Sequence, residues 1–210
     1  SIGLYDFDLI TPPLTYGLVD PHEASFIPLG FSYEMTLEEM LVKHPKGLEY
    51  GHIVKQHPRW PLLFDSKSKV LSFPPIINSD DLGRITEDTK NLLVEVTGTA
   101  NQTVANTLMM MVIAALDRGG KLYTSTIRYP YGRARVMVTP NMNSREMRLN
   151  PDYVQHVLGV KLSLQQIKKS LRRARFGADA VEGPALHVEV PCYRLDVMHP
   201  VDLAEDIAVA

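Results

Sequence analysis

Residues 70–116, VLSFPPIINSDDLGRITEDTKNLLVEVTGTANQTVANTLMMMVIAAL, decide the fold of the first part of this chain. They predict a strand, a Pro-Pro corner, a polar turn, a second strand at 92–96, a tight Gly turn and an apolar helix. Glu95 interrupts the otherwise apolar second strand, and the small residues 97–99 follow it. Because layered folds usually place ligands where a strand ends before a helix, we expect a binding site around Glu95.

The helix at the end of this stretch is predicted from its caps. Asn101 or Thr103 can cap its N-terminus, and the glycines at 119–120 accept the left-handed conformation that ends a helix. Residues 108–116 are apolar nearly all round, which predicts a buried helix. The three methionines at 109–111 would suit an adaptable groove, although core filling is the commoner role of such a run.

Composition places the chain among ordinary globular proteins. Of its 210 residues, 45% are hydrophobic and 22% are charged, and the net charge is −2, so nucleic-acid binding would need a local basic patch. The longest apolar run is too short to span a membrane. The single cysteine, Cys192, excludes an intrachain disulfide and fits a reducing cytosol. The chain starts without a signal peptide and stops within a helical pattern, so we expect a fragment.

An α+β protein with two domains is expected from the local signals. In residues 1–140 a capping box at Thr36 and Glu39 predicts a helix that ends in a turn at 44–47. Two strands joined at 66–68 form a hairpin, and further strands are predicted at 121–128 and 135–139. We therefore expect a mixed-sheet domain over 1–140.

A small winged-helix-like domain is expected over 141–210, truncated at its C-terminus. Asn150 and Pro151 open a helix that ends at Gly159. Ser163 with Gln166 opens a second helix, which should run to about residue 175 and stop at Gly177. A strand at 187–190 and a helix from 203 onward complete the pattern.

The second helix of this domain carries a dense group of basic residues. This group is Lys168, Lys169, Arg172, Arg173 and Arg175. Such a run can track a phosphate backbone, but a charged face is also the default for an amphipathic helix, so both interpretations stay open.

Two polar groupings suggest chemistry. Ser72, Glu95, Thr97 and the turn of Thr99 and Asn101 could converge to hydrogen-bond a polar ligand and position water for ester hydrolysis, although a carboxylate at a strand end more often caps an amide. The second grouping lies near the C-terminus. It consists of four carboxylates, Asp196, Asp202, Glu205 and Asp206. Carboxylates suit a hard cation such as Mg²⁺, although the helix dipole alone favours acidic residues at the start of a helix.

Three motifs resemble one family. LSFPPIINS at 71–79, VEVTGT at 94–99 and PCYRLDVMHPVDLAEDIAVA at 191–210 are similar to the beta subunit of phenylalanyl-tRNA synthetase of the archaeal and eukaryotic cytosolic type. The resemblance implies that the first domain edits, removing tyrosine wrongly joined to tRNA(Phe). A synthetic site cannot strongly reject a near-isostere that only adds a hydroxyl, which is why a second sieve is needed.

Residue roles follow from the same resemblance. Leu63 and Ser72 would shape a slot for the aromatic ring, and Glu95 would accept the tyrosine phenolic O–H. Thr97 would hold the substrate or the attacking water. Archaeal members of the family tend to carry Asp at the acidic position, where this chain has the longer Glu95.

For the whole enzyme, the resemblance implies a cytoplasmic α2β2 tetramer that attaches phenylalanine to tRNA(Phe) with ATP. The aminoacylation centre would lie in the alpha subunit. Mg²⁺ would be shared with that subunit at the four C-terminal carboxylates. No membrane partner is expected. The alternative is a non-catalytic RNA-binding or subunit-scaffold module.

Overall fold

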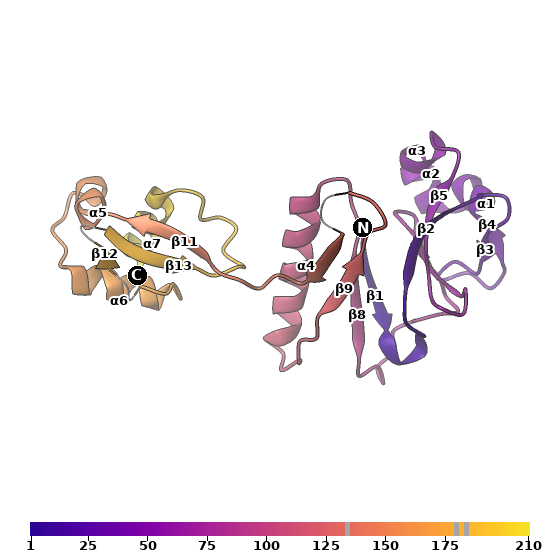
Figure 1. The fold of residues 1–210 in the computed structure, drawn as a ribbon, viewed down its shortest axis with the longest axis horizontal. Coiled ribbons are helices and arrows are strands. Elements are labelled where there is room, and N and C mark those ends of the chain that lie inside the picture. Colours follow the sequence, from indigo (N-terminus) through magenta and orange to yellow (C-terminus); the bar gives the residue numbers. More distant parts are fainter. Residues whose placement is uncertain (133–134, 179–180, 183–184) are drawn as a thin grey trace. The chain divides into compact units, whose positions relative to one another are not determined.

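The computed structural model describes residues 1–132, 135–178, 181–182 and 185–210 (Figure 1). The chain divides into two compact units, Ser1–Leu108 and Met109–Ala210. Both combine helices and strands, which confirms the predicted α+β class, and every strand pairing among the described residues is antiparallel. The division falls within helix α4 (Asn101–Leu116), upstream of the domain boundary that the sequence predicts near residue 140.

The first unit contains three sheets. A four-stranded sheet has the order β2 (Thr15–Val19), β5 (Trp60–Phe64), β6 (Val70–Phe73), β7 (Ile77–Asn78). The other two are pairs, β1 (Ile2–Asp6) with β8 (Leu92–Val96) and β3 (Ser25–Phe26) with β4 (Met35–Thr36). The predicted strand at 92–96 and the hairpin of β5 with β6 are confirmed.

Short helices follow β4. They are α1 (Leu37–Lys43), α2 (Pro45–Tyr50) and α3 (His52–Lys55), while the 3-10 turn η1 (Phe7–Leu9) follows β1. The predicted capping box of Thr36 and Glu39 opens α1. The turn predicted at 44–47 is wrong, because Pro45 takes the first position of α2 and the ring of His44 accepts a hydrogen bond from the Lys46 amide. Proline is tolerated at the first position of a helix, because the N–H that it lacks would have no hydrogen-bond partner within the helix.

Two apolar clusters hold the first unit together. One packs α1 and α3 against the four-stranded sheet and includes Met40, Val54 and Phe73. The other joins β1 to the same sheet and contains Tyr5, Ile10, Leu63, Leu71 and Leu82. This second cluster brings β1 and its partner β8 next to the strands that carry Leu63 and Ser72.

Helix α4 has the predicted bounds but not the predicted burial. Met109 and Val112 are buried, whereas half of Met110 is exposed. A helix that is apolar on all sides is buried only where other parts of the protein pack against every side. In this chain, only one side of α4 is covered. Among the described residues, no helix is both long and apolar enough to cross a membrane.

In its described residues, the second unit holds the last part of α4, a hairpin, a three-stranded sheet and further helices. The hairpin is β9 (Ser125–Arg128) with β10 (Val136–Thr139), and the sheet has the order β11 (Arg145–Leu149), β13 (Ala185–Val190), β12 (Val181–Glu182). The helices are α5 (Pro151–Leu158), α6 (Leu164–Arg173) and α7 (Pro200–Val209). The predicted caps of α5 and the capping box of α6 are confirmed. Strand β11 was not predicted, because three of its five residues are charged.

Helix α6 ends earlier than predicted. Its last turn closes through hydrogen bonds from the Phe176 amide to the Leu171 carbonyl, 2.9 Å, and from the Arg175 amide to the Arg172 carbonyl, 3.0 Å. This is a Schellman motif, and Arg175 occupies its left-handed position with φ 68°. Gly177 instead bridges to Glu189 of β13, where an added Cβ would lie 2.9 Å from the Glu189 Cβ.

The core of the second unit depends on α6. Ile167 is fully buried among residues of β13 and α7. We expect Ile167→Ala to lower the free energy of unfolding by about 2–5 kcal/mol, because it removes buried methyl groups and leaves a cavity. Urea unfolding measures this change. Gln165→Ala, at an exposed position of the same helix, should change stability by no more than about 0.5 kcal/mol. Equal losses in the two variants would contradict the packing described.

Candidate functional site

Adjacent strands place Leu63 and Ser72 side by side. Leu63 of β5 lies opposite Ser72 of β6, and Ser72 lies opposite Asn78 of β7. Residues directly opposite each other point to the same face of a sheet. Leu63, Ser72 and Asn78 therefore form one row across three strands, with an apolar side chain beside a hydroxyl and an amide.

Tyr5 connects this row to Glu95. The Tyr5 side chain is 1% exposed, and its hydroxyl lies 3.1 Å from Glu95 Oε2 and 3.2 Å from Asn78 Oδ1. The hydroxyl has one proton to donate, and a carboxylate is the stronger acceptor. A phenol of the chain itself thus makes the contact with Glu95 that the sequence predicts for a substrate phenol. The sequence analysis missed Tyr5, although a tyrosine in the short apolar strand IGLYD is a recognisable signal.

Gly3 makes room for this contact. It lies directly opposite Glu95 in the β1–β8 ladder. A Cβ at this position would lie 2.5 Å from the Tyr5 hydroxyl oxygen and 2.7 Å from Glu95 Oε2. Real Cβ atoms do not approach so closely, so the absence of a side chain at Gly3 is a condition for the Tyr5–Glu95 hydrogen bond.

Three buried polar atoms at this site have no hydrogen-bond partner among the described residues. They are Ser72 Oγ, Glu95 Oε1 and Thr97 Oγ1, which belong to the three polar residues that the sequence predicts for the site. Other buried polar side chains are used locally: Asp65 accepts from the amides of Lys67 and Lys69, and Ser79 accepts from the Asp81 amide. An unpaired buried polar atom lowers stability, so a concentration of three indicates a place prepared for a polar ligand.

Electrostatics at the site centre on the Glu95 carboxyl. Burial raises its pKa above the ordinary range, while the Tyr5 and Thr97 hydroxyls and the positive amino terminus oppose the rise. The pKa of Tyr5 is raised by burial first and then by the charge of Glu95, and the nearby Ser72 hydroxyl works against this shift. The site therefore keeps Tyr5 protonated as a donor. Its hydroxyl contacts Glu95 Oε2, while Glu95 Oε1 has no hydrogen-bond partner among the described residues.

Thr97 lies at the edge of this group. It lines a cavity of about 380 Å³ at the end of β8, together with Gly98, Thr99, Thr103 and Thr107. Leu63, Ser72 and Glu95 do not line this cavity. The structure thus brings Ser72 and Glu95 together around Tyr5, and it places Thr97 between that buried group and a mainly apolar cavity that several threonines border.

In the arrangement that the structure shows, the acidic residues near the C-terminus do not form a magnesium site. Arg194 Nη2 is 2.6 Å from both Asp196 Oδ2 and Asp206 Oδ2. Asp202 accepts hydrogen bonds from the amides of Met198 and His199, both at 2.7 Å, and so caps α7. The described residues contain no group of three or more His, Cys, Asp or Glu side chains arranged to hold a metal.

The sequence predicts Mg²⁺ as the positive charge beside these carboxylates, whereas in the structure Arg194 supplies that charge. It lowers the pKa of Asp196, and its guanidinium also lies over the ring of Phe176. Glu205, the fourth predicted ligand, is exposed on α7. Magnesium binding by these four residues stays a prediction, and we derive no chemical step from it.

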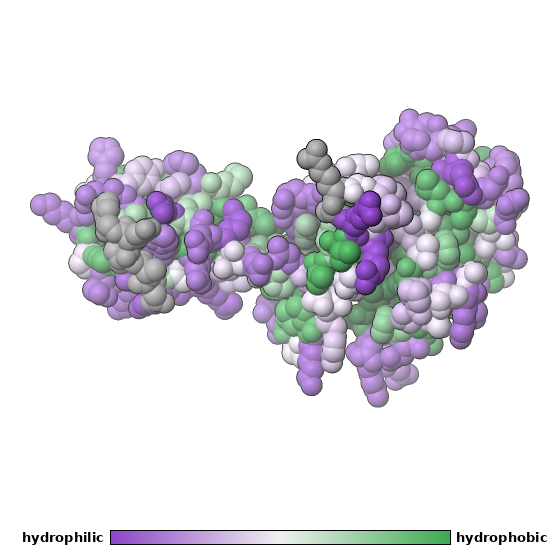
Figure 2. All heavy atoms as spheres, viewed as in Figure 1, coloured by the Kyte–Doolittle hydropathy of each residue, from purple (hydrophilic) through white to green (hydrophobic). Residues whose placement is uncertain are grey.

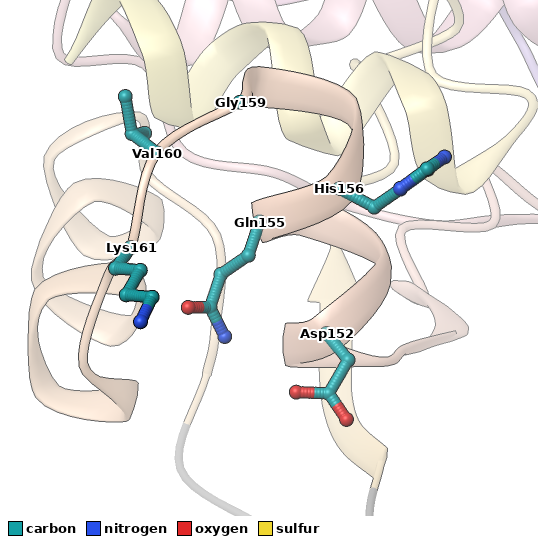
Figure 3. Close-up of a pocket in the computed structure, with 6 residues that line it drawn as sticks. All are labelled: Asp152, Gln155, His156, Gly159, Val160 and Lys161. Carbon is teal, nitrogen blue, oxygen red and sulfur yellow. The ribbon is translucent and has the colours of Figure 1, made fainter.

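A second cavity, of about 440 Å³, lies beside α5 (Figure 3). Asp152 and His156 point away from Lys161 in this view, so the polar groups do not converge. Gln155 Oε1 accepts from the Leu162 amide, 3.3 Å, and supports the loop after the helix. We assign this cavity no ligand.

Comparisons with known proteins find similarity to one family. Residues 147–210 match the family described as tRNA synthetase B5 domain. Over 210 residues the chain is 40% identical to the phenylalanine–tRNA ligase beta subunit of Pyrococcus furiosus, of which it covers 37%, and 40% identical to that of Methanococcoides burtonii, of which it covers 38%. An N-terminal fragment of the phenylalanyl-tRNA synthetase beta subunit from Pyrococcus horikoshii matches the whole chain with a TM-score of 0.94 at 39% identity, and the chain covers 59% of it. The chain thus spans little more than a third of these two subunits.

Removing the Tyr5 hydroxyl should change the pH dependence of stability. A carboxyl whose pKa is raised on folding binds its proton more tightly in the folded state. Stability therefore falls as the pH rises from the ordinary pKa of this carboxyl, 4.5, through its raised pKa in the folded chain. Relative to Glu95→Gln, the original chain should therefore lose stability across this range. In Tyr5→Phe the loss should extend to higher pH, because the donor that favours the charged form is gone.

Urea unfolding from about pH 4 to pH 8 measures these differences. Tyr33→Phe is the control, because Tyr33 is 52% exposed. It should leave the pH profile unchanged. Identical profiles for Tyr5→Phe and the original chain would show that the Tyr5–Glu95 contact does not govern the carboxyl.

Replacing Arg194 should expose the role of the acidic cluster. We expect Arg194→Met to lower the free energy of unfolding by about 1–3 kcal/mol, because Asp206 loses a charged hydrogen-bond partner in a partly buried position. Adding MgCl₂ or EDTA should leave the thermal midpoint of the original chain unchanged. Lys46→Met, which breaks the exposed pair with Glu49, should cost less than about 1 kcal/mol. A midpoint that rises with MgCl₂ would contradict the assignment to Arg194.

Proposed function

We propose that this chain, which belongs to the phenylalanine–tRNA ligase beta-subunit family and spans part of such a subunit, carries a site that hydrolyses tyrosine wrongly attached to tRNA(Phe). The observation that carries the proposal is the coincidence of the three buried unpartnered atoms with the three polar residues predicted for this site. A tyrosyl ester can supply donors for a carboxylate and partners for hydroxyls. The Thr97 hydroxyl also acts on Glu95 and the Ser72 hydroxyl on Tyr5, in each case lowering the pKa of the partner, but neither hydroxyl makes a hydrogen bond of good geometry.

Recognition of tyrosine would depend on Glu95. Its Oε2 is held by the Tyr5 hydroxyl, which leaves Oε1 to accept the phenolic O–H of the substrate. Phenylalanine offers no such donor, and it would leave the carboxylate oxygen without a partner. Buried polar groups that lose their partner make the largest contribution to selectivity of this kind. Leu63, in the row with Ser72, would contact the ring.

Hydrolysis would take place on the Thr97 side of the group. The attacking water forms a bond to the ester carbonyl carbon, the bond from that carbon to the ribose oxygen breaks, and the ribose oxygen takes up a proton. Thr97 Oγ1 is buried without a partner and borders the cavity at the end of β8. It is therefore suited to hold the water or the ester through a hydrogen bond and so to fix the direction of attack.

Within a whole ligase, the site would act as a second sieve. We propose that the complete protein pairs with an alpha subunit, binds tRNA(Phe) and attaches phenylalanine using ATP and Mg²⁺ in the cytoplasm. A non-catalytic RNA-binding or scaffold module is the alternative, and it predicts RNA binding without hydrolysis of the tyrosyl ester.

The proposal is tested by deacylation of Tyr-tRNA(Phe) by the 210-residue chain, with Phe-tRNA(Phe) as the comparison substrate. Glu95→Gln should reduce the preference for the tyrosyl ester by roughly tenfold to a hundredfold, because a charged acceptor is lost. Thr97→Val, which is close in shape, should reduce the rate for both esters, because water or ester positioning is lost.

The matched control for these variants is Glu87→Gln. It removes the same charge from an exposed position and should leave rate and preference unchanged. Circular dichroism checks that each variant is folded. An unchanged preference in folded Glu95→Gln would remove Glu95 from the site, and RNA binding without deacylation by the original chain would favour the scaffold alternative.

A further inference from the structure

We propose that Tyr5 is a positioning residue that sets the selectivity of the Glu95 site for a phenol over an unsubstituted aromatic ring. It holds one oxygen of the Glu95 carboxylate, so that the other oxygen depends on the substrate for a hydrogen-bond donor. The inference rests on the proposed function, because it concerns the site that would recognise the tyrosyl ester. It adds a residue that acts only through Glu95.

The ring of Tyr5 and its hydroxyl serve different purposes. The ring belongs to the apolar cluster that joins β1 to the four-stranded sheet and includes Leu63 and Leu71. Phenylalanine would fill the same space without the free-energy cost of burying a hydroxyl. Hydrophilic residues cover much of the visible surface of the molecule (Figure 2), whereas Tyr5 is only 1% exposed. Packing therefore accounts for an aromatic ring at this position but not for its hydroxyl.

The position of the hydroxyl connects it with Glu95. Strands β1 and β8 run side by side (Figure 1), and Tyr5 lies opposite Leu93, two residues before Glu95. The Tyr5 oxygen is 3.1 Å from Glu95 Oε2 and 3.2 Å from Asn78 Oδ1. A hydroxyl has one proton, and a charged acceptor forms the stronger hydrogen bond, so the proton goes to Glu95. Burial raises the pKa of Tyr5, which keeps the hydroxyl protonated as a donor.

Gly3 keeps the space for this contact open. A Cβ there would lie 2.5 Å from the Tyr5 oxygen and 2.7 Å from Glu95 Oε2, so any other residue would displace one of the two groups. The backbone at Gly3 is not left-handed and does not itself require glycine. Glycine within a strand lowers its stability and often marks a close approach of other groups. The contact between hydroxyl and carboxylate is therefore the reason for glycine at this position.

Holding one oxygen makes the carboxylate a selective acceptor. Oε1 of Glu95 is buried and has no partner among the described residues. With Oε2 bonded to Tyr5, the carboxylate cannot turn to find another donor. A tyrosyl ring supplies the missing donor, whereas a phenylalanyl ring leaves Oε1 unpaired and is rejected. Without the Tyr5 hydroxyl, Glu95 would bind a proton more readily, and a neutral carboxyl rejects phenylalanine less strongly.

The charge of Glu95 also depends on two other neighbours. Burial raises the pKa of Glu95, and the Tyr5 hydroxyl, the Thr97 hydroxyl and the positive amino group of Ser1 oppose the rise. That amino group donates to the Thr97 carbonyl at 2.8 Å. Among the described residues, Tyr5 and the Ser1 amino group are thus the titratable groups that act on the carboxyl. Ser1 and Thr97 stay unchanged in the variants below, so a shift of the pH profile reports Tyr5 itself.

Deacylation of Tyr-tRNA(Phe) and Phe-tRNA(Phe) by the 210-residue chain tests the inference. Tyr5→Phe should lower the ratio of kcat/KM for the tyrosyl over the phenylalanyl ester by roughly tenfold at about pH 7, because a hydrogen bond to a charged group is lost. The ratio is high above the pKa of Glu95 and falls as pH drops through it. In Tyr5→Phe this fall should move to higher pH, since the donor that favours the charged form is missing. Tyr33→Phe, which removes an exposed hydroxyl, should leave the profile unchanged.

A double variant shows whether Tyr5 acts through Glu95. The ratio should already be low in Glu95→Gln, so that adding Tyr5→Phe changes it by less than about twofold. Two losses that multiply would contradict the inference, because Tyr5 would then act elsewhere.

Gly3→Ala provides a second route to the same effect. Its Cβ displaces the hydroxyl or the carboxylate, so it should lower the ratio as Tyr5→Phe does. Gly17→Ala on β2 is the matched control. A Cβ at Gly17 would meet only carbon atoms of Phe64 and Thr15, and the ratio should not change.

The outcomes for the inference and for the proposed function are separate. A low ratio in Glu95→Gln with an unchanged ratio in Tyr5→Phe refutes the positioning role and leaves the site intact. An unchanged ratio in Glu95→Gln refutes the site, and the role of Tyr5 with it. A Tyr5→Phe chain that circular dichroism shows to be unfolded also overturns the inference, because the hydroxyl would then serve folding.

Binding measurements decide the matter if the original chain hydrolyses neither ester. Isothermal titration with L-tyrosine and L-phenylalanine then gives the ratio of affinities. A preference for tyrosine that Tyr5→Phe lowers supports the positioning role while the hydrolytic function fails. Equal affinities in the original chain, or a preference that Tyr5→Phe leaves unchanged, refute the positioning role.

Discussion

The buried contact between Tyr5 and Glu95 is the constraint on which the first unit depends. It lies within the β1–β8 pair and requires a glycine directly opposite the carboxylate, and it holds the Tyr5 hydroxyl 3.2 Å from Asn78 Oδ1 at the end of β7. A carboxyl in an apolar interior is costly unless a donor compensates it. Tyr5 compensates only one oxygen, and so the fold itself fixes which side of Glu95 stays free for another molecule.

Local signals in the sequence predicted the local structure well. The capping boxes of α1 and α6, the caps of α5 and the strand at 92–96 were found because neighbouring residues alone determine them. The partner of Glu95 was missed because Tyr5 precedes it by 90 residues and only the tertiary fold brings them together. Burial of α4 was wrong for the related reason that a helix pattern cannot show how many sides are covered.

The acidic cluster shows the same limit from the other direction. Asp202 and Asp206 lie one turn apart on α7, but the cation beside Asp206 comes from the preceding loop. Arg194 reaches Asp206 from 12 positions away, and Arg145 of β11 fixes that loop by donating to the carbonyls of Arg194 and Val197. A row of carboxylates predicts a need for positive charge; whether a metal or a guanidinium meets it depends on the rest of the fold.

The two predicted sites can therefore be told apart by hydrogen-bond satisfaction. At the C-terminal cluster, Asp196, Asp202 and Asp206 have found partners within the chain, so the fold alone explains their presence. Around Glu95, three buried oxygen atoms have none among the described residues. Buried polar groups are rarely left unsatisfied, and these three atoms are therefore the basis on which we propose a ligand here.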